Sequence, residues 1–464
     1  MFNSPVVRRL LLVLCVSSVL PCGSSASQDN LVRDKYPSGK TRTEYRVDKE
    51  GKKHGSYVEF FESGKKKVTA TFVHGDPDGQ WDEYRDDGHS WLRKKYKTGT
   101  IEELIRLDDK GPSYQVLFKR DGIEIGPPGS KTNDPAFPLS QNMIRTRIPE
   151  IEGTPMDVSG ENAKLKYEEP YSLTAPHKPG KLKREYLEDA LRHLKAYRWL
   201  CGLTTDQELD DGCIDFCQHG AVIMGAIKEL THFPEQPADM DKAFFDKAYK
   251  GTSSSNIASG SDSLRQAIDM FMDDSDSTNI DRVGHRMWCL NPRKKKAGFG
   301  EVEMWICEWS VDSSAEIPRP DFVRYPAAGY FPVEYFHSHA AWCCSVNADK
   351  YTLPKDEKQI KVKLWTLDDE YMIKDEIPLD YFHKNGNNLI FRPKAAAEGN
   401  QPRRPGPRVG YDWAGKRVLV YITGAKQQKV DAPIFYVVEF FKLKKDEKKP
   451  EEPPPAEPTE DRPK

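Results

Sequence analysis

The chain lacks the features that would assign it at once to several large functional classes. Its 464 residues have a formal net charge of −2, so there is no excess of Lys and Arg to bind a nucleic-acid backbone. The Gly-x-Ser-x-Gly turn that exposes a nucleophilic serine in α/β-hydrolases is missing. Beyond the first 26 residues no apolar stretch is long enough to cross a bilayer. These absences argue against nucleic-acid binding, against that kind of serine hydrolysis and against a transmembrane segment in the mature chain.

Cysteine is also scarce, which excludes a disulfide-rich scaffold. Seven of the nine cysteines follow residue 26, an odd number and a low density for a small disulfide-stabilised fold. Cys213 and Cys217 would share one helix face, but no second Cys/His pair of zinc-finger spacing accompanies them. We therefore interpret these two as buried side chains that behave as small apolar groups. Disulfide pairing stays open for the whole set of Cys201, Cys213, Cys217, Cys289, Cys307, Cys343 and Cys344.

The N-terminus has the pattern of an export signal. Arg8 and Arg9 precede an apolar run over residues 10–20, which is shorter than a membrane-spanning helix. Small residues favour cleavage after Ala26, and lipid attachment at Cys22 is the alternative. We expect residues 1–26 to be a signal peptide and the protein to be secreted, periplasmic or held at the cell surface.

Residues 36–100 contain an internal repeat with an offset of 24 residues. Glycines match glycines and aromatic residues match aromatic residues: Gly51, Gly55, Tyr57, Phe60 and Gly64 correspond to Gly75, Gly79, Trp81, Tyr84 and Gly88. Each unit is typical of a β-hairpin with glycine turns. One hairpin cannot bury its aromatic face alone, so we expect neighbouring hairpins to stack. Residues 36–39 look like a third, partial copy, and residues 111–125 fit one further hairpin.

The repeat is similar to MORN-type repeats of the bacterial, antitoxin-like kind. This resemblance implies a structural or interaction module over residues 30–125. Such a module would make contacts with other proteins or with a surface, and no cluster of catalytic side chains in it indicates another role.

The middle of the chain divides into an irregular and a helical part. Residues 126–180 are rich in Pro and Gly and have no sustained period, so we expect a linker. From residue 181 apolar residues recur every three or four positions, which predicts amphipathic helices. The predicted helices run from residue 181 to about Tyr197, from about 206 to 230 and from about 263 to 272.

After Pro318 the pattern changes to short strands separated by turn residues. Strands are predicted around residues 361–365, 389–391, 418–422 and 434–441, which is typical of a β-sandwich over residues 316–443. Residues 444–464 are charged and rich in Pro, and they cannot bury enough apolar surface to fold, so we expect a disordered tail.

The helical part carries short motifs in a fixed order. They are Tyr197-Arg198 before a Gly-Leu turn, His232 after the second helix, Asn256-Ile257-Ala258, the helix 267–272, Gly284-His285-Arg286, Leu290-Asn291-Pro292 and Gly298-Phe299-Gly300. This ordered set resembles the CAP domain, the family of cysteine-rich secretory, antigen-5 and pathogenesis-related proteins, in its bacterial form. The resemblance implies an α-β-α sandwich over residues 181–315. The expected fold class is therefore α+β and multidomain, with N-terminal hairpin repeats, a CAP-like centre and a C-terminal β-sandwich.

In the CAP family two histidines and two acidic residues line a central cleft, which in some members holds a divalent metal. Carried over by position, His232 and His285 are the two imidazoles, and imidazole is a good ligand for zinc. Asp274 fits the second acidic position, but Ser255 stands where the family has Glu, which removes a ligand and a candidate general base. Arg286 is interpreted as pairing with a helix end or a carboxylate. The resemblance thus implies a cleft lined by His232, Ser255, Asn256, Asp274, His285 and Arg286, with His232 and His285 as candidate ligands for zinc or another divalent ion.

Two functions fit this sequence. The favoured one is a non-catalytic protein that binds a small apolar or cell-envelope ligand in the cleft, with the flanking modules providing surface contacts. The alternative is a metal-assisted hydrolase of peptides or cell-envelope polymers, which needs His232, His285 and an acidic residue to meet at one ion. The incomplete acidic set favours the first function. No catalytic residue is assigned, and whether the protein is an enzyme stays open at this point.

Overall fold

The structure, a computed structural model, describes residues 30–108, 111–119, 122–126, 139–369, 373–394 and 412–444. The predicted signal peptide, the alternative lipid site Cys22 and the predicted tail beyond residue 444 lie outside these ranges. Helices and strands are both abundant, which gives a mixed α+β, multidomain architecture. None of the helices in these ranges combines the length and the apolar character needed to cross a membrane.

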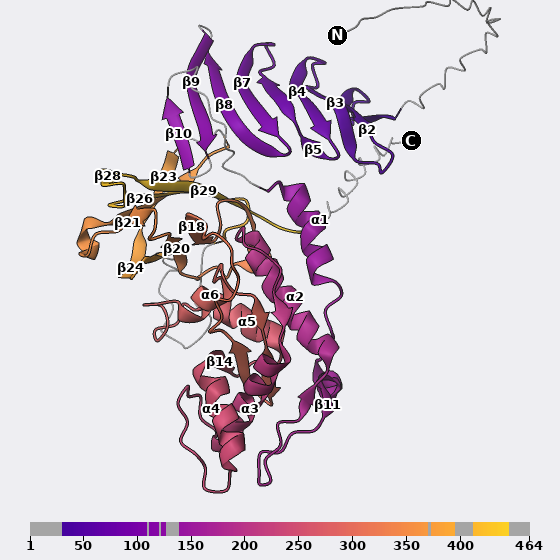
Figure 1. Cartoon of the computed structure of the whole chain (residues 1–464). Helices are drawn as coiled ribbons and strands as arrows, with labels where there is room; N and C mark the ends of the chain where they lie inside the picture. The colour runs from indigo at the N-terminus through magenta and orange to yellow at the C-terminus, as the bar shows by residue number, and fades with distance from the viewer. Residues whose placement is uncertain are drawn as a thin grey trace, which may run out of the picture.

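The N-terminal part is one antiparallel sheet in which strands follow one another in sequence order (Figure 1). The strands are β1 (Leu31–Lys35), β2 (Thr41–Val47), β3 (Lys53–Phe60), β4 (Lys66–Val73), β6 (Gly79–Tyr84), β7 (Ser90–Lys97), β8 (Thr100–Asp108), β9 (Gly111–Lys119) and β10 (Gly122–Gly126), with β5 (Asp76–Pro77) paired to β4 alone. The predicted hairpins, including the further one at 111–125, are confirmed.

The repeat is visible in the packing as well as in the strands. Tyr57 and Trp81, which occupy matching positions in the two copies, stack with ring centroids 6.2 Å apart and an interplanar angle of 19°. Phe72 fills the space beside both rings. Stacking of one hairpin on the next is therefore confirmed, and it buries aromatic surface that a single hairpin would leave exposed.

Helices dominate the central part of the chain. They are α2 (Arg184–Leu200), α3 (Asp211–Ile227), α4 (Lys242–Ser253), α5 (Leu264–Asp273) and α6 (Gly284–Cys289). The helices α2, α3 and α5 confirm the predicted ones, whereas the sequence patterns gave no prediction for α4. A signal for α4 is present: Asp241 caps the helix by accepting hydrogen bonds from the backbone N–H groups of Ala243 and Phe244.

The expected linker is wrong for residues 139–180, which are largely structured. Helix α1 (Gln141–Glu152) begins after the N-cap Ser140, and the short helix η1 (Gly160–Lys166) leads into β11 (Tyr167–Glu169). The helix α1 packs along α2 and buries Ile144 and Ile148. The sequence of α1 does not show a regular helical pattern of apolar residues, because Pro149 lies inside the helix and the buried residue Glu152 is charged.

A small three-stranded sheet lies against the central helices, in the order β14 (Ser255–Ser259), β17 (Trp305–Trp309) and β16 (Phe299–Val302). The helix α3 crosses β16 and β17 closely. A Cβ on Gly298 would lie 2.5 Å from the backbone carbon of Cys213, so glycine is required there. Two-stranded pairs complete this part: β11 with β12 (Lys181–Leu182), and β13 (Glu208–Leu209) with β15 (Lys296–Ala297).

Two larger sheets follow in the C-terminal part. The four-stranded sheet has the order β18 (Phe322–Tyr325), β20 (Trp342–Val346), β25 (Asn388–Pro393) and β24 (Leu379–Asn385). The five-stranded sheet has the order β19 (Gly329–Pro332), β29 (Ile434–Phe441), β26 (Arg417–Thr423), β22 (Lys361–Leu367) and β23 (Ile373–Ile377). The remaining short elements are η2 (Val333–Tyr335), η3 (Glu357–Gln359), β21 (Tyr351–Thr352), β27 (Lys426–Gln427) and β28 (Val430–Asp431). The four strands predicted in this part are confirmed.

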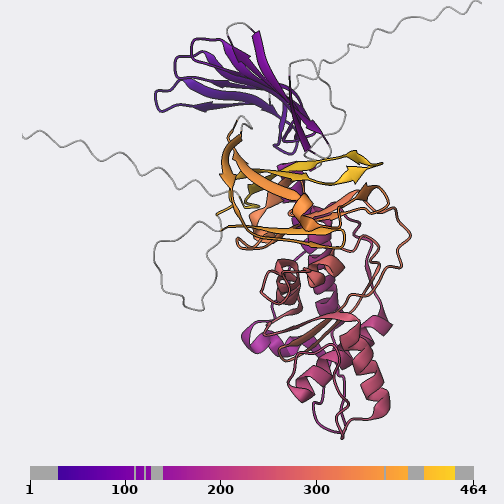
Figure 2. The ribbon, with the colours of Figure 1, turned by 90° about the vertical axis from the view of Figure 1, so that its left-hand side faces the viewer.

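The five-stranded sheet is covered on both faces. On one face Phe440 contacts Trp342 of the four-stranded sheet, with ring centroids 5.8 Å apart. On the other face Leu419 and Val437 pack with Leu92 and Leu104 of the repeat sheet. Two views at right angles place these strands between the repeat sheet and the helices (Figures 1 and 2). Burial on both faces explains why β26 and β29 are apolar almost without interruption.

Candidate functional site

The cleft residues expected from the CAP resemblance fall into two places. Asp274, His285, Arg286 and Asn256 lie together where α5, α6 and β14 meet. Asp274 is the C-cap of α5 in the left-handed conformation, with φ of 44°, and its side chain points back to the start of α6. There its Oδ1 lies 2.8 Å from Nδ1 of His285, and its Oδ2 accepts a hydrogen bond from the backbone N–H of Arg286.

Arg286 serves the fold rather than an open cleft. Its guanidinium is completely buried and donates to the backbone carbonyls of Met272 and Asp273, which end α5, and of Ala341. It also lies 4.7 Å over the ring of Tyr325. Binding of the helix end is what the sequence interpretation expected of Arg286, and it leaves this group no free face for a ligand.

The side-chain amide nitrogen of Asn256 is also engaged inside the protein. Its side-chain amide donates to the carbonyl of His285 and to Oε2 of Glu308, at 3.1 and 2.8 Å. Glu308 in turn forms an ion pair with Lys294 at 2.8 Å, and both of these side chains have no exposed surface. Burial of two charges is costly unless they are paired, so this pair and the Asn256 amide act together as an internal tie between β14, β17 and the segment after α6.

The other two predicted residues lie away from this group. Ser255 is buried, and its Oγ lies 3.5 Å from Sγ of Cys217 on α3. His232 is half-buried in the connection after α3, where Nδ1 lies 2.8 Å from the backbone carbonyl of Thr252. Each imidazole of the predicted pair thus has a different partner: His285 has Asp274 and His232 has a backbone carbonyl.

Metal ligands of suitable spacing occur in another part of the molecule. Within the described ranges one group of three ligating side chains has all its ligand atoms within 4.8 Å of one another, and it consists of Asp48, His54 and His74 in the repeat sheet. His232 and His285 are not members of such a group. The prediction that they bind zinc or another divalent ion has no third protein ligand to support it within the described chain.

A buried polar cluster that the sequence did not reveal lies between α1, α2 and α5. His193 lies between two carboxylates, with Nδ1 2.7 Å from Glu152 and Nε2 2.7 Å from Asp269. Glu152 also accepts from Arg265 and Tyr335. These partners are far apart in sequence, and one belongs to the expected linker, so no local motif could have indicated them.

The charges of this cluster shift the acidity of its members. Burial alone would lower the pKa of His193, but the two carboxylates raise it above its ordinary value. Burial acts to raise the pKa of Glu152, yet His193, Arg265 and Tyr335 outweigh it and lower that pKa to about 2. Below its raised pKa His193 is an imidazolium between two carboxylates, and the cluster is then a buried ionic tie.

A second histidine cluster adjoins the end of α5. Asp273 Oδ2 lies 3.0 Å from Nε2 of His339 and 3.4 Å from Nδ1 of His337. Burial would raise the pKa of Asp273, but the two histidines hold it well below its usual range. The histidines are partly exposed, so this cluster borders solvent, in contrast to the cluster at His193.

Next to α6 a groove of about 410 Å³ separates that helix from the four-stranded sheet. Trp288 lines it with 37% of its surface exposed, and Asn385 and Asn387 are exposed at its other side. Asn388 is 5% exposed and lines the same groove, and its side-chain Nδ2 has no hydrogen-bond partner within the described chain. Exposed side-chain amides and an exposed aromatic ring in one groove are features that a polar ligand can contact.

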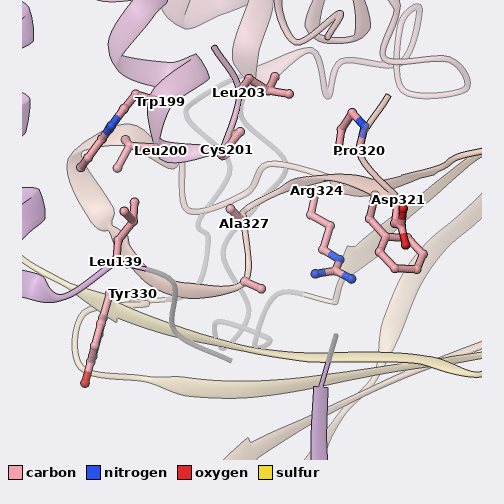
Figure 3. Close-up of a pocket in the computed structure, with 13 residues that line it drawn as sticks. Leu139, Trp199, Leu200, Cys201, Leu203, Pro320, Asp321, Arg324, Ala327 and Tyr330 are labelled. Carbon is pink, nitrogen blue, oxygen red and sulfur yellow. The ribbon is translucent and has the colours of Figure 1, made fainter. Parts of the chain in front are cut away.

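A second hollow, of about 430 Å³, lies between the end of α2 and the strands β18 and β19. Figure 3 shows Leu139, Trp199 and Leu200 on one side of it and Asp321 and Arg324 on the other. The Arg324 guanidinium lies 4.4 Å from the centre of the Phe322 ring and 4.6 Å from that of Tyr436. Arg324 is thus packed against two aromatic rings, and Asp321 forms an ion pair with Lys350 at 2.5 Å.

The seven cysteines of the described chain are all buried, and none of them forms a disulfide bond there. Cys213 and Cys217 are buried, as the sequence interpretation predicted. Burial raises the pKa of Cys213 to about 12 and raises the pKa of Cys217 further. Neither thiol is a candidate nucleophile or metal ligand, since the thiolate is the reactive form.

Comparisons with known proteins give little help. No family model matches the chain, and no curated protein matches it. Twelve chains of solved structures match parts of it. One, from the crystal structure of accessory secretory protein 1, 2 and 3 in Streptococcus pneumoniae, is 22% identical, with coverage of 21% of this chain and 19% of that one and a TM-score of 0.15. Another, from a GtfA/B complex bound to UDP and GlcNAc, is 10% identical, with coverage of 26% and 25% and a TM-score of 0.17. The chain thus spans a quarter or less of these proteins, and such low scores carry no argument about fold or function.

Proposed function

We propose that this chain is an exported, non-catalytic binding protein with a CAP-like centre, MORN-type repeats before it and a β-sandwich after it. Under this proposal residues 30–125, 181–315 and 316–443 are the three modules, and the structured part of residues 139–180 belongs with the centre. Export rests on the N-terminal sequence pattern. The CAP assignment rests on the ordered motifs and is supported by helices and a small sheet at the corresponding positions.

One observation carries the choice of binding over catalysis. Three polar groups expected to work in the cleft are engaged inside the protein: Asp274 lies 2.8 Å from His285, Asn256 donates to Glu308, and Arg286 donates to backbone carbonyls. The groove beside α6, by contrast, is lined by the exposed ring of Trp288 and by the exposed side chains of Asn385 and Asn387. We therefore infer that a ligand binds in this groove, next to the predicted cleft.

The groove favours a ligand rich in hydroxyl groups, such as a cell-envelope glycan. Side-chain amides can donate to and accept from hydroxyls, and an exposed indole can pack against the apolar face of a sugar ring. A purely apolar ligand would cover the exposed amides of Asn385 and Asn387 without replacing their hydrogen bonds to water, at a cost of about 1–3 kcal/mol for each amide left unpaired. Of the two ligand classes expected from the sequence, the cell-envelope class fits better.

Co-sedimentation with insoluble peptidoglycan tests this function. We expect the protein to sediment with the polymer, and Trp288→Ala and Asn387→Ala to lose most of that binding. Phe233→Ala is the matched control, because Phe233 is 68% exposed and lies in a loop away from the groove. Equal binding by the wild type and Trp288→Ala would overturn the proposal.

The same samples test the alternative, a metal-assisted hydrolase. Release of soluble fragments that depends on added Zn²⁺ and is lost in His232→Ala and His285→Ala would establish hydrolysis. Under the binding proposal no fragments are released, and the two histidine variants sediment as the wild type does.

A further inference from the structure

Three potential metal ligands meet at one end of the repeat sheet. Asp48 lies in the turn between β2 and β3, His54 lies in β3, and His74 lies in the turn between β4 and β5. Their ligand atoms are within 4.8 Å of one another. They come from two successive hairpins, so the site exists only when the hairpins are stacked.

The distances between these groups are close to those of a metal centre. Nδ1 of His74 lies 2.9 Å from Oδ2 of Asp48, and the rings of His54 and His74 have centroids 4.9 Å apart. In a tetrahedral zinc site with bonds of about 2.1 Å, ligand atoms are about 3.4 Å apart. Shifts of these side chains by little more than an ångström would bring all three onto one ion.

The turn that carries Asp48 already orients this carboxylate. Oδ1 of Asp48 accepts hydrogen bonds from the backbone N–H groups of Glu50 and Lys52, at 3.0 and 2.9 Å. This leaves Oδ2 directed to His74. Ligands held by such additional hydrogen bonds are typical of metal centres, because the orientation is fixed before the ion arrives.

The position of His74 is accessible from outside. Its side chain is 65% exposed, and it lines a hollow of about 560 Å³ between the repeat sheet and α1. An ion can therefore enter, and a water molecule can complete its coordination. The repeat itself shows that the turn does not require histidine: Thr98, which is 24 residues further on, has φ of 47° against 49° for His74.

We propose that Asp48, His54 and His74 form a binding site for a zinc-class divalent metal ion. Two imidazoles and one carboxylate suit zinc and similar borderline ions, whereas Mg²⁺ and Ca²⁺ prefer sets made of oxygen atoms. The ion would fasten two hairpins to each other at the edge that faces α1. This site is separate from His232 and His285 and from the groove beside α6.

Calorimetric titration of the full chain with Zn²⁺ tests the proposal. We expect about one equivalent to bind, and His74→Thr, which copies the residue of the next turn, to weaken binding by about tenfold or more, since loss of even an outer partner of a ligand has that effect. Asp48→Asn should act in the same direction while it keeps the turn. His89→Ala is the matched control, because His89 is exposed on the same sheet beside a single carboxylate, Asp87.

Three outcomes would overturn the proposal. The wild type could bind no Zn²⁺, or the titration of His74→Thr could superimpose on that of the wild type. The third outcome is loss of the strong site in the double variant His232→Ala/His285→Ala with retention in His74→Thr, which would place the ion in the central part. Retention in the double variant and loss in His74→Thr support the site. A parallel titration with Mg²⁺ should show no comparable binding, and strong Mg²⁺ binding would contradict the proposed ligand chemistry.

Discussion

The repeat sheet and the central part of the molecule are stabilised by polar contacts of different range. In the sheet, side-chain pairs join neighbouring strands and remain near solvent, as in the pair of Arg33 and Glu44, which are 55% and 35% exposed. In the centre, charged groups are buried and join segments far apart in sequence, as in the pair of Lys166 and Glu301, which are 7% and 0% exposed. The sheet is thus a series of local units, whereas the centre depends on contacts that exist only after the whole fold has formed.

This difference has an energetic consequence. A surface pair contributes about 0–1 kcal/mol, because water competes for both charges. A buried pair adds little net stability, but removal of one partner strands the other charge at a cost of about 3–5 kcal/mol. Variants in the two regions should therefore differ strongly for the same type of substitution.

The largest effect is expected when the ion pair of Lys294 and Glu308 is broken. Lys294→Met leaves Glu308 charged and without exposed surface, so the free energy of unfolding should fall by about 3–5 kcal/mol in urea denaturation. The double variant Lys294→Met/Glu308→Gln should recover part of this loss, because the stranded charge is then gone. A loss below about 1 kcal/mol would mean that the pair behaves like a surface pair.

Glycine also plays a different part in the two regions, which gives the next largest effect. A Cβ on Gly300 would collide with backbone atoms of Cys217 on α3, whereas a Cβ on Gly64 in the repeats would meet nothing within 4 Å, although its φ is 90°. Gly300→Ala should cost about 3 kcal/mol through overpacking. Gly64→Ala should cost about 1–2 kcal/mol through the left-handed backbone alone.

Substitution by asparagine distinguishes steric overlap at Gly300 from the left-handed backbone conformation at Gly64. Gly64→Asn should be milder than Gly64→Ala, since Asn tolerates the left-handed region, and Gly300→Asn should be at least as harmful as Gly300→Ala. The midpoints of thermal unfolding rank the four variants. If the difference in thermal midpoint between the Asn and Ala variants were the same at both sites, steric overlap and backbone conformation would not be the separate causes.

The same contrast explains what could be predicted from the sequence. The hairpins and the pairing of Tyr57 with Trp81 were predictable, because residues in contact also match at a fixed offset. The helices α2, α3 and α5 were predictable from their apolar period. The helix α1 was not, because it packs partly through Glu152, whose partner His193 is 41 residues away.

The candidate site, like the fold, could be predicted only where short motifs in the sequence indicate it. The CAP resemblance brought Asp274 and His285 into one pocket, and they lie 2.8 Å apart. It could not show that Arg286 and Asn256 donate to groups inside the protein, because the partners named for them come from the end of α5 and from β17. The groove at Asn388 also depends on two segments about a hundred residues apart, so no local motif marks it.

Stability should depend on pH through the buried cluster at His193 in the centre. The pKa of His193 is raised in the folded state above an ordinary value of about 6.5, so its contribution to stability is complete below that pH and is lost as pH rises through the folded pKa. Glu152, with its pKa lowered to about 2, contributes above its ordinary 4.5 and loses that contribution as pH falls toward 2. The stability difference between the wild type and His193→Gln should therefore shrink as pH rises above about 6.5.

Urea midpoints measured at several pH values between about 5 and 9 check this dependence on pH. This range of pH includes the ordinary pKa of His. A parallel series on His89→Gln, in which an imidazole that is 76% exposed in the repeat sheet is removed, measures the effect of losing an exposed histidine. A difference between the wild type and His193→Gln that stays constant with pH would mean that the imidazole of His193 is not charged between its two carboxylates.

The smallest effect is expected for the exposed pair of Arg33 and Glu44 in the repeat sheet. Their charges lie only 2.7 Å apart, closer than those of Lys294 and Glu308, so distance alone would rank this pair as the stronger. Solvent exposure reverses that order, and Arg33→Gln should change the free energy of unfolding by about 0.5 kcal/mol or less, with a still smaller effect in high salt. Urea denaturation at low and high ionic strength measures both values. A loss above about 1 kcal/mol would show that the sheet, like the centre, depends on its ion pairs.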